Sequence, residues 1–164
     1  MTDTPVTSTP SESSTSPDAM DPVAAARAVA EGRSAADIAG VPAEVQELLY
    51  ATALGYFDGG RFKEAIELLM SLVVLDIRNP DYWSVLGNCQ MREGRFAEAL
   101  EAWQMTLSVK PSRIAAALVA RTAIALKDRT AAAEALLIMS TRLTSEADES
   151  EFAALGEALL KLPA

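Results

Sequence analysis

Alanine and leucine recur every three or four positions through most of the chain after residue 20, a period that predicts amphipathic α-helices. Capping residues and glycines divide this pattern into separate elements. Two helices and a turn are predicted before residue 60: a short helix that starts after Asp21-Pro22 and stops at Gly32, a brief turn over 35–39 that Ser34 caps and Gly40 ends, and a longer helix from Pro42 to about Asp58.

The rest of the pattern is periodic over a longer distance. GRFKEAIE at 60–67 and GRFAEALE at 94–101 are nearly the same sequence, 34 positions apart. A fixed period of this size is the sequence signature of a helical repeat. The first unit is predicted to span about 46–79 and the second about 80–113.

A third unit is weaker and requires a change of spacing. If the spacing stayed at 34, Arg121 would stand where Gly87 stands in the second unit, at the crossing of two helices. A spacing of 33 instead places Ala120 and Ala132 at the crossing and Lys127-Asp128 in the turn. The helices of this unit are then predicted over 112–126 and 129–143.

A last helix is predicted over 146–162, because Ser145 with Asp148 three residues later resembles a capping box. A terminal helix of this kind would cover the apolar edge that the last repeat leaves open.

The second unit fits the tetratricopeptide (TPR) pattern, in which Trp, two residues and Leu-Gly are followed by small and aromatic residues at set offsets and a closing proline. Small residues allow the two helices of a hairpin to approach, and a glycine makes the turn between them. Phe96 and Trp103 are expected to fill the space behind the crossing. The predicted fold is all-α: three TPR helical hairpins in a superhelical stack, with an N-terminal helix and a C-terminal capping helix. The predicted structural positions are Ala53, Gly60, Ala65, Gly87, Gly94, Ala99 and Pro111.

The charge is −9 in total and is concentrated at the two ends of the chain. Residues 1–22 carry four acids and no base, residues 143–164 carry five acids and one lysine, and residues 46–142 carry eleven of each. The body of the repeat is therefore neutral. A neutral body without a basic stripe argues against nucleic acid and against anionic membrane surfaces as partners.

Composition also predicts the domains and the compartment. Residues 1–20 are rich in Ser, Thr and Pro and are expected to form a disordered polar leader, followed by an N-terminal helical and dimerisation segment at 21–41 and the TPR domain at 42–164. The start of the chain lacks the basic and apolar regions of a secretory signal, and no apolar run is long enough to span a bilayer. With a single cysteine, these features indicate the cytoplasm and no direct membrane insertion.

Candidate chemistry is sparse, so no enzyme, cofactor or metal is predicted. The chain has no histidine, which removes the commonest general base and metal ligand. Cys89 occupies an inward position of a predicted helix, where an inert buried thiol is expected. The acids at 146–151 are interpreted as a solvated helix N-terminus.

Recognition remains, and repeat geometry assigns it to the face formed by the first helix of each hairpin. The cargo-binding positions predicted on this face are Tyr50, Leu54 and Phe57 in the first unit, Ser84, Asn88 and Met91 in the second, and Ala117, Arg121 and Ile124 in the third. Only Asn88 and Arg121 could serve a clamp for a chain-end carboxylate, so an extended segment with apolar anchors is the better fit. For Tyr50 and Phe57, core packing and groove are equally open.

The stretch from Gly32 to Trp103 resembles the class II chaperones of bacterial type III secretion systems. Those proteins show a Gly-x-Ser/Thr turn, then Leu-Tyr-x-x-Ala and Gly-Lys/Arg-Tyr/Phe-x-x-Ala, then Leu-x-x-Leu-Asp before the second repeat. The matching residues here are Gly32-Arg33-Ser34 to Ile38, Leu49-Tyr50, Ala53-Leu54, Phe57, Gly60-Arg61-Phe62, Ala65 and Leu72 to Asp76. Three features depart from the family pattern: Leu54 replaces a common aromatic, the N-terminal helix is rich in alanine and the leader is long.

The resemblance implies a function. Members of that family hold hydrophobic translocator proteins in the bacterial cytosol before export, grip an extended cargo segment in the concave groove, and often form homodimers through their N-terminal helices. Two alternatives remain open: a general TPR adaptor that joins folded proteins, and a secretion-linked regulator whose main partner is a transcription factor.

Overall fold

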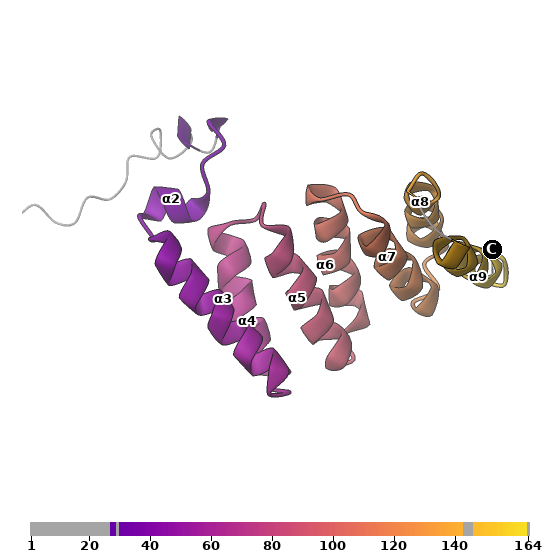
Figure 1. Cartoon of the computed structure of the whole chain (residues 1–164), viewed down its shortest axis with the longest axis horizontal. Helices are drawn as coiled ribbons and strands as arrows, with labels where there is room; N and C mark the ends of the chain where they lie inside the picture. The colour runs from indigo at the N-terminus through magenta and orange to yellow at the C-terminus, as the bar shows by residue number, and fades with distance from the viewer. Residues whose placement is uncertain (1–26, 29, 143–145, 164) are drawn as a thin grey trace, which may run out of the picture. The chain divides into compact units, whose positions relative to one another are not determined.

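The computed structural model describes residues 27–28, 30–142 and 146–163 (Figure 1). The chain divides into two compact units, Met1–Arg33 and Ser34–Ala164. The predicted leader at 1–20 and most of the predicted helix after Asp21-Pro22 lie outside the described residues. The helices of the second unit are α2 (Ala35–Ala39), α3 (Ala43–Asp58), α4 (Phe62–Leu75), α5 (Pro80–Arg92), α6 (Phe96–Val109), α7 (Arg113–Ala125), α8 (Arg129–Ser140) and α9 (Glu146–Leu160).

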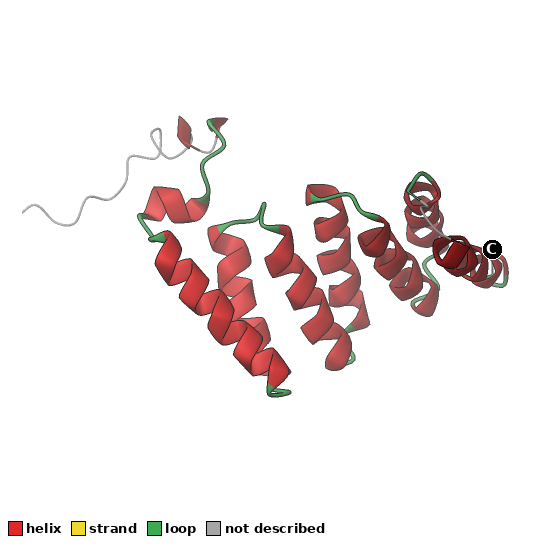
Figure 2. Ribbon diagram, in the orientation of Figure 1, coloured by secondary structure: helices red, strands yellow, loops and turns green. Residues whose placement is uncertain are grey.

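The second unit is all-helical over its described residues, as predicted, and Figure 2 shows helices joined by short loops. The predicted caps of the short helix α2 are present. Ser34 and Asp37 form a capping box in which the Asp37 backbone N–H donates to Ser34 Oγ (3.1 Å), and Gly40 ends the helix with a φ of 67°. The predicted segment 21–41 is thus shared between the two units, because α2 belongs to the second.

Three antiparallel hairpins follow, α3–α4, α5–α6 and α7–α8, and each helix packs against the next one along the chain (Figure 1). Helix α9 contacts both α7 and α8, so it covers the end of the stack as the sequence predicts. The spacing confirms the predicted slip: α4 and α6 begin 34 positions apart, whereas α5 and α7, like α6 and α8, begin 33 apart.

The turns inside the hairpins show the same slip. Gly60 and Gly94 adopt positive φ angles of 72° and 73°, and Lys127 takes the equivalent place with a φ of 61°. This left-handed conformation is easy for glycine and disfavoured for a residue with a Cβ atom. Lys127 therefore holds the third hairpin in register at some cost in stability.

The small residues predicted at the helix crossings are buried. Gly87 is the tightest case, because a Cβ atom built there would lie 2.9 Å from Cε2 of Trp103. The indole ring of Trp103, which is 1% exposed, therefore packs directly on the backbone of α5. The crossing residues with no exposed surface in the three hairpins are Ala53, Ala65, Ala99, Ala120 and Ala132.

Phe96 does not fill the space behind the crossing, which corrects the expectation for that residue. It is the first residue of α6 and 44% of its side chain is exposed, so it lies at the end of the hairpin rather than inside it. Its counterpart Phe62 is half-buried because it packs edge-on against Phe57 of the preceding helix, with ring centroids 5.6 Å apart.

The apolar core has two clusters. One joins α3, α4 and α5 around Leu69, Leu72 and Leu86, and the other joins α6, α7, α8 and α9 around Trp103 and Met139. Stacking of this kind buries each hairpin against its neighbours. Helix α9 enters the second cluster through Leu155, with Phe152 and Leu159 packed beside it.

Candidate functional site

We call the surface formed by the first helices of the three hairpins, α3, α5 and α7, the first-helix face. All nine predicted binding residues lie on these helices. These nine side chains differ in their solvent exposure. Asn88 and Arg121 are exposed, Tyr50, Leu54, Phe57, Ser84, Met91 and Ile124 are half-buried, and Ala117 is buried.

The structure does not support Ala117 as a binding residue. It is 4% exposed and belongs to the core cluster that α9 joins, so its methyl group cannot contact a ligand on the surface. The residue one turn earlier, Ile114, is 64% exposed instead.

The aromatic residues at the N-terminal end of the face are partly committed to packing inside the protein. Tyr50 packs against Tyr82 of α5 with ring centroids 5.1 Å apart, and Phe57 packs against Phe62 of α4. Burial, together with the nearby negative charge of Asp81, raises the pKa of the Tyr50 phenol. Both Tyr50 and Phe57 flank the first core cluster and keep part of their surface accessible. Tyr50 and Phe57 therefore pack against the core and also keep surface that a ligand could contact.

Between α5 and α7 the face has a cavity of about 290 Å³. Of the predicted residues only Ser84 lines it. Sequence reasoning missed Asp81 and Ile114, which stand one turn before Ser84 and Ala117 at the same repeat position and could have been found from that spacing. The further lining residues are Pro80, Trp103, Thr106, Lys110, Ser112, Ala115 and Leu118.

The floor of this cavity includes an unusual polar group. Trp103 is 1% exposed, and its indole Nε1 has no hydrogen-bond acceptor among the described residues. A buried N–H without a partner is destabilising, and such groups are commonly satisfied by water or a ligand. The cavity therefore combines apolar walls from Ile114 and Leu118 with a few polar groups.

At the C-terminal end of the face, the predicted binding residue Arg121 forms an ion pair with a carboxylate of helix α9. Arg121 Nη1 lies 3.5 Å from Glu151 Oε1 on α9. Arg113 binds the same helix more tightly: its Nε is 2.9 Å from Asp148 Oδ1 and its Nη1 is 2.8 Å from Glu151 Oε2. Because Glu151 already neutralises Arg121, a clamp for a carboxylate remains disfavoured.

These ion pairs also correct the interpretation of the acids at 146–151. Asp148 is 7% exposed and Glu151 is half-buried, so two of the acids attach α9 to α7 instead of standing in solvent. No local sequence pattern signals this contact, because the partners are 30 or more positions apart.

The remaining predicted residues make local contacts. Asn88 Nδ2 donates to the Ser84 carbonyl (3.1 Å), and Thr122 Oγ1 of α7 lies 3.9 Å from Met91 Sδ of α5. Ile124 packs against the second core cluster. Met91 and Ile124 thus help to join the second and third hairpins as well as contributing to the face.

Two kinds of candidate chemistry can be examined in the described residues: metal ligation and the thiol of Cys89. No group of three or more metal-ligating side chains occurs among them. Cys89 is buried, and burial raises the pKa of its thiol to about 11, so it is protonated near neutral pH. Within the described part of the chain, no helix is long and apolar enough to cross a membrane.

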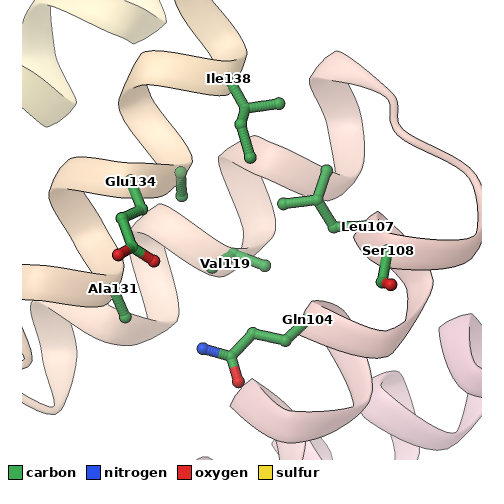
Figure 3. A pocket seen from close by; sticks show the side chains of 8 residues that line it. Gln104, Leu107, Ser108, Val119, Ala131, Glu134 and Ile138 are labelled. Carbon is green, nitrogen blue, oxygen red and sulfur yellow. The ribbon is translucent and has the colours of Figure 1, made fainter.

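A cavity of about 230 Å³ lies among the second helices of the hairpins. Figure 3 shows Leu107, Val119 and Ile138 around it, with Gln104 and Glu134 nearby. It shares no residue with the predicted set.

No family model matches the chain. The chaperone protein SicA of Salmonella typhimurium is 31% identical over 83 residues, which are 50% of this chain and 50% of SicA, and the protein of that name from Salmonella typhi matches equally. The chain therefore spans about half the length of the curated relatives it matches.

Solved structures confirm the fold. The type III secretion chaperone SycD of Yersinia enterocolitica, in complex with a peptide of the translocator YopD, has a TM-score of 0.61 at 16% identity over 74% of this chain and 95% of SycD. PcrH of Pseudomonas aeruginosa, in complex with the chaperone binding region of PopD, has a TM-score of 0.59 at 20% identity over 75% of this chain and 94% of PcrH. The first TPR domain of Spaghetti, bound to an HSP90 peptide, has a TM-score of 0.61 at 19% identity over 74% of this chain and 98% of that domain. The chain has the TPR-like fold of these proteins.

Proposed function

We propose that this protein is a bacterial cytoplasmic chaperone of type III secretion that binds a hydrophobic translocator protein before export. It holds an extended segment of the translocator along the first-helix face and performs no catalysis. SicA, a chaperone protein, matches the chain in sequence, and the fold is shared with SycD and PcrH, which bind segments of translocators.

The observation that carries the proposal is the cavity between α5 and α7, together with partly accessible apolar side chains on the first helix of the preceding hairpin. Ile114 and Leu118 line the cavity, and Tyr50, Leu54 and Phe57 are half-buried on α3. An extended peptide can place spaced apolar side chains into pockets of this kind. Helix α9 neutralises Arg121, so apolar anchoring suits the face better than recognition of a chain-end carboxylate.

The test is co-expression with candidate translocators, followed by size-exclusion chromatography. The informative variant is Ile114→Asp, because this side chain lines the cavity, is 64% exposed and can be changed with little effect on folding. Leu137→Asp on α8, 70% exposed, is the matched control. We expect Ile114→Asp to abolish co-elution and Leu137→Asp to retain it. Equal binding by both variants would place the cargo elsewhere, and no complex with any translocator would favour the adaptor alternative.

Tyr50 and Phe57 require a different substitution, because alanine would open the core cluster that they flank and lower stability by about 2–4 kcal/mol each. Tyr50→Phe removes only the hydroxyl and keeps the contact with Tyr82. Leu54→Asn, at a half-buried position between the two aromatic residues, tests the α3 part of the face while leaving both rings in place.

We also propose that the protein self-associates near the start of α3. Val45 and Leu48 are 43% and 68% exposed on this helix, next to the predicted dimerisation segment at 21–41. Light scattering after size exclusion tests this proposal: Leu48→Asp should give a monomer, whereas Leu160→Asp, 76% exposed on α9, should not change the mass. A wild-type protein that is monomeric at high concentration would contradict it.

A further inference from the structure

A third cavity, of about 340 Å³, lies between α4, α5 and α6 and is lined by none of the nine predicted binding residues. Its volume is at the small end of the range of about 300–1,000 Å³ that is usual for ligand pockets. Ile66, Met70, Trp83, Leu86 and Ala102 provide apolar walls. Its polar lining residues are Gln90, Arg95, Glu98 and Glu101.

Gln90 is the residue that this fold leaves unexplained. It is 5% exposed, and its Oε1 is buried without a hydrogen-bond donor among the described residues. A buried acceptor in this state destabilises the protein by an amount comparable to a lost hydrogen bond. Gln90 is also one of the residues that line the cavity, so a donor from outside the chain would satisfy this oxygen.

The charge of the cavity indicates what kind of donor fits. Arg95 Nε is 3.0 Å from Glu98 Oε1, so these two side chains neutralise each other. Glu101 makes no ion pair with any described residue and is exposed at the cavity. The cavity therefore carries one uncompensated negative charge next to an unpaired acceptor, which favours a cation that donates hydrogen bonds.

The surface beside the cavity is apolar. Met70, which lines it, and Val74, one turn further along α4, are 49% and 70% exposed. Ile77, in the loop after α4, is 56% exposed, and Trp83 Nε1 donates to its carbonyl (2.7 Å), which ties this loop to the cavity wall. An exposed apolar patch of this kind marks an interaction surface.

We propose that this cavity and the apolar patch of Met70, Val74 and Ile77 form a second docking site, for a basic amphipathic segment of a partner protein. Apolar side chains of the segment cover the patch. A lysine or arginine lays its aliphatic stem along Trp83 and Met70 and brings its charged end to Gln90 and Glu101. The leader of this chain does not fit the site, because residues 1–22 contain four acids and no base.

The site is independent of the proposed translocator groove, since the two cavities have no residue in common. A chaperone with both sites could bind cargo and a second protein at the same time. The second protein is defined here by its chemistry alone: an apolar helix face with one long cationic side chain.

The experiment uses the full chain and a set of blocked helical peptides of about 15 residues, with leucines on one face and a central lysine, norleucine or glutamate. Binding is measured by isothermal titration calorimetry and located from the Trp83 indole and Gln90 amide signals in ¹⁵N–¹H spectra. We expect the lysine peptide to bind about tenfold more tightly than the norleucine peptide and the glutamate peptide to bind weakest. In Gln90→Leu with Glu101→Gln, the lysine and norleucine peptides should bind equally.

The matched control is Glu134→Gln, at the position equivalent to Glu101 in the third repeat, beside the other second-helix cavity. It should keep the preference for lysine, as should Ile114→Asp in the translocator groove. Gln90→Leu replaces an unpaired polar group by an apolar one, so it should not lower the urea midpoint. The proposal is overturned by the absence of saturable binding, by equal affinity for the three peptides, or by signals that move at Ser84 and Ile114 instead of Trp83.

Discussion

The contact between Gly87 and Trp103 gives the sharpest test of how this stack is held together. A Cβ atom at residue 87 would lie 2.9, 3.0 and 3.1 Å from Cε2, Cδ2 and Cζ2 of the indole ring, closer than normal van der Waals contact. The first and third hairpins have a different pair of residues at the same helix crossing. They have alanine at the equivalent of Gly87 (Ala53 and Ala120) and leucine at the equivalent of Trp103 (Leu69 and Leu136). The large ring and the missing Cβ atom therefore compensate each other.

The size of the effect follows from two opposing terms. Gly87→Ala overpacks a ring that is 1% exposed, which costs about 1–3 kcal/mol, and gains up to about 1 kcal/mol because alanine favours the helix. We expect a net loss of about 1 kcal/mol. In a Trp103→Leu background the clash is gone, so the same Gly87→Ala change should increase stability by about 0.5–1 kcal/mol. The coupling between the two sites is then about 2 kcal/mol.

The assay is urea unfolding of the wild type, the two single variants and the double variant, followed by circular dichroism at 222 nm so that the loss of an indole does not affect the signal. Slopes in urea should agree among the four proteins, because all unfold the same surface. The sign of the Gly87→Ala effect should reverse between the two backgrounds. If Gly87→Ala changes stability equally in both, then the ring does not press on the backbone of α5 and the reasoning is refuted.

Three further predictions concern other parts of the stack. Lys127→Gly should raise the free energy of unfolding by about 1 kcal/mol, because it relieves the positive φ of 61°, whereas Asp128→Ala, which removes the N-cap of α8, should lower it by a similar amount. Arg113→Ala should remove the ion pairs that join α7 to Asp148 and Glu151 of α9 and lower stability by about 1–3 kcal/mol, with faster amide hydrogen exchange in α9 but not in α3, while the exposed Arg92→Ala should leave α9 unchanged. Cys89 should react with a disulfide reagent at pH 8 only after urea is added, because burial holds its pKa at about 11 in the folded state; rapid reaction of the native protein would show that α5 opens readily.

The fold could be predicted from local patterns in the chain, because the features that specify it repeat from one hairpin to the next. Spacing alone predicts the period of 34, the small residues at the crossings, the turn at Lys127 and the slip to 33 in the third hairpin. Local capping signals placed α2 within its bounds, since Ser34 and Asp37 lie within one turn of each other. The placement of the nine predicted positions on the first helices of the hairpins also followed from the repeat register.

The tertiary structure alone decided which of these positions can meet a ligand. Ala117 is buried in the second core cluster and Arg121 is paired with Glu151 of α9, and no local pattern joins residues 30 or more positions apart. The cavities, the unpaired Gln90 oxygen and the exposed ring of Phe96 depend on the angle and distance between neighbouring hairpins. Periodicity fixes which face of a helix a residue occupies, whereas its exposure depends on how closely the next helix approaches.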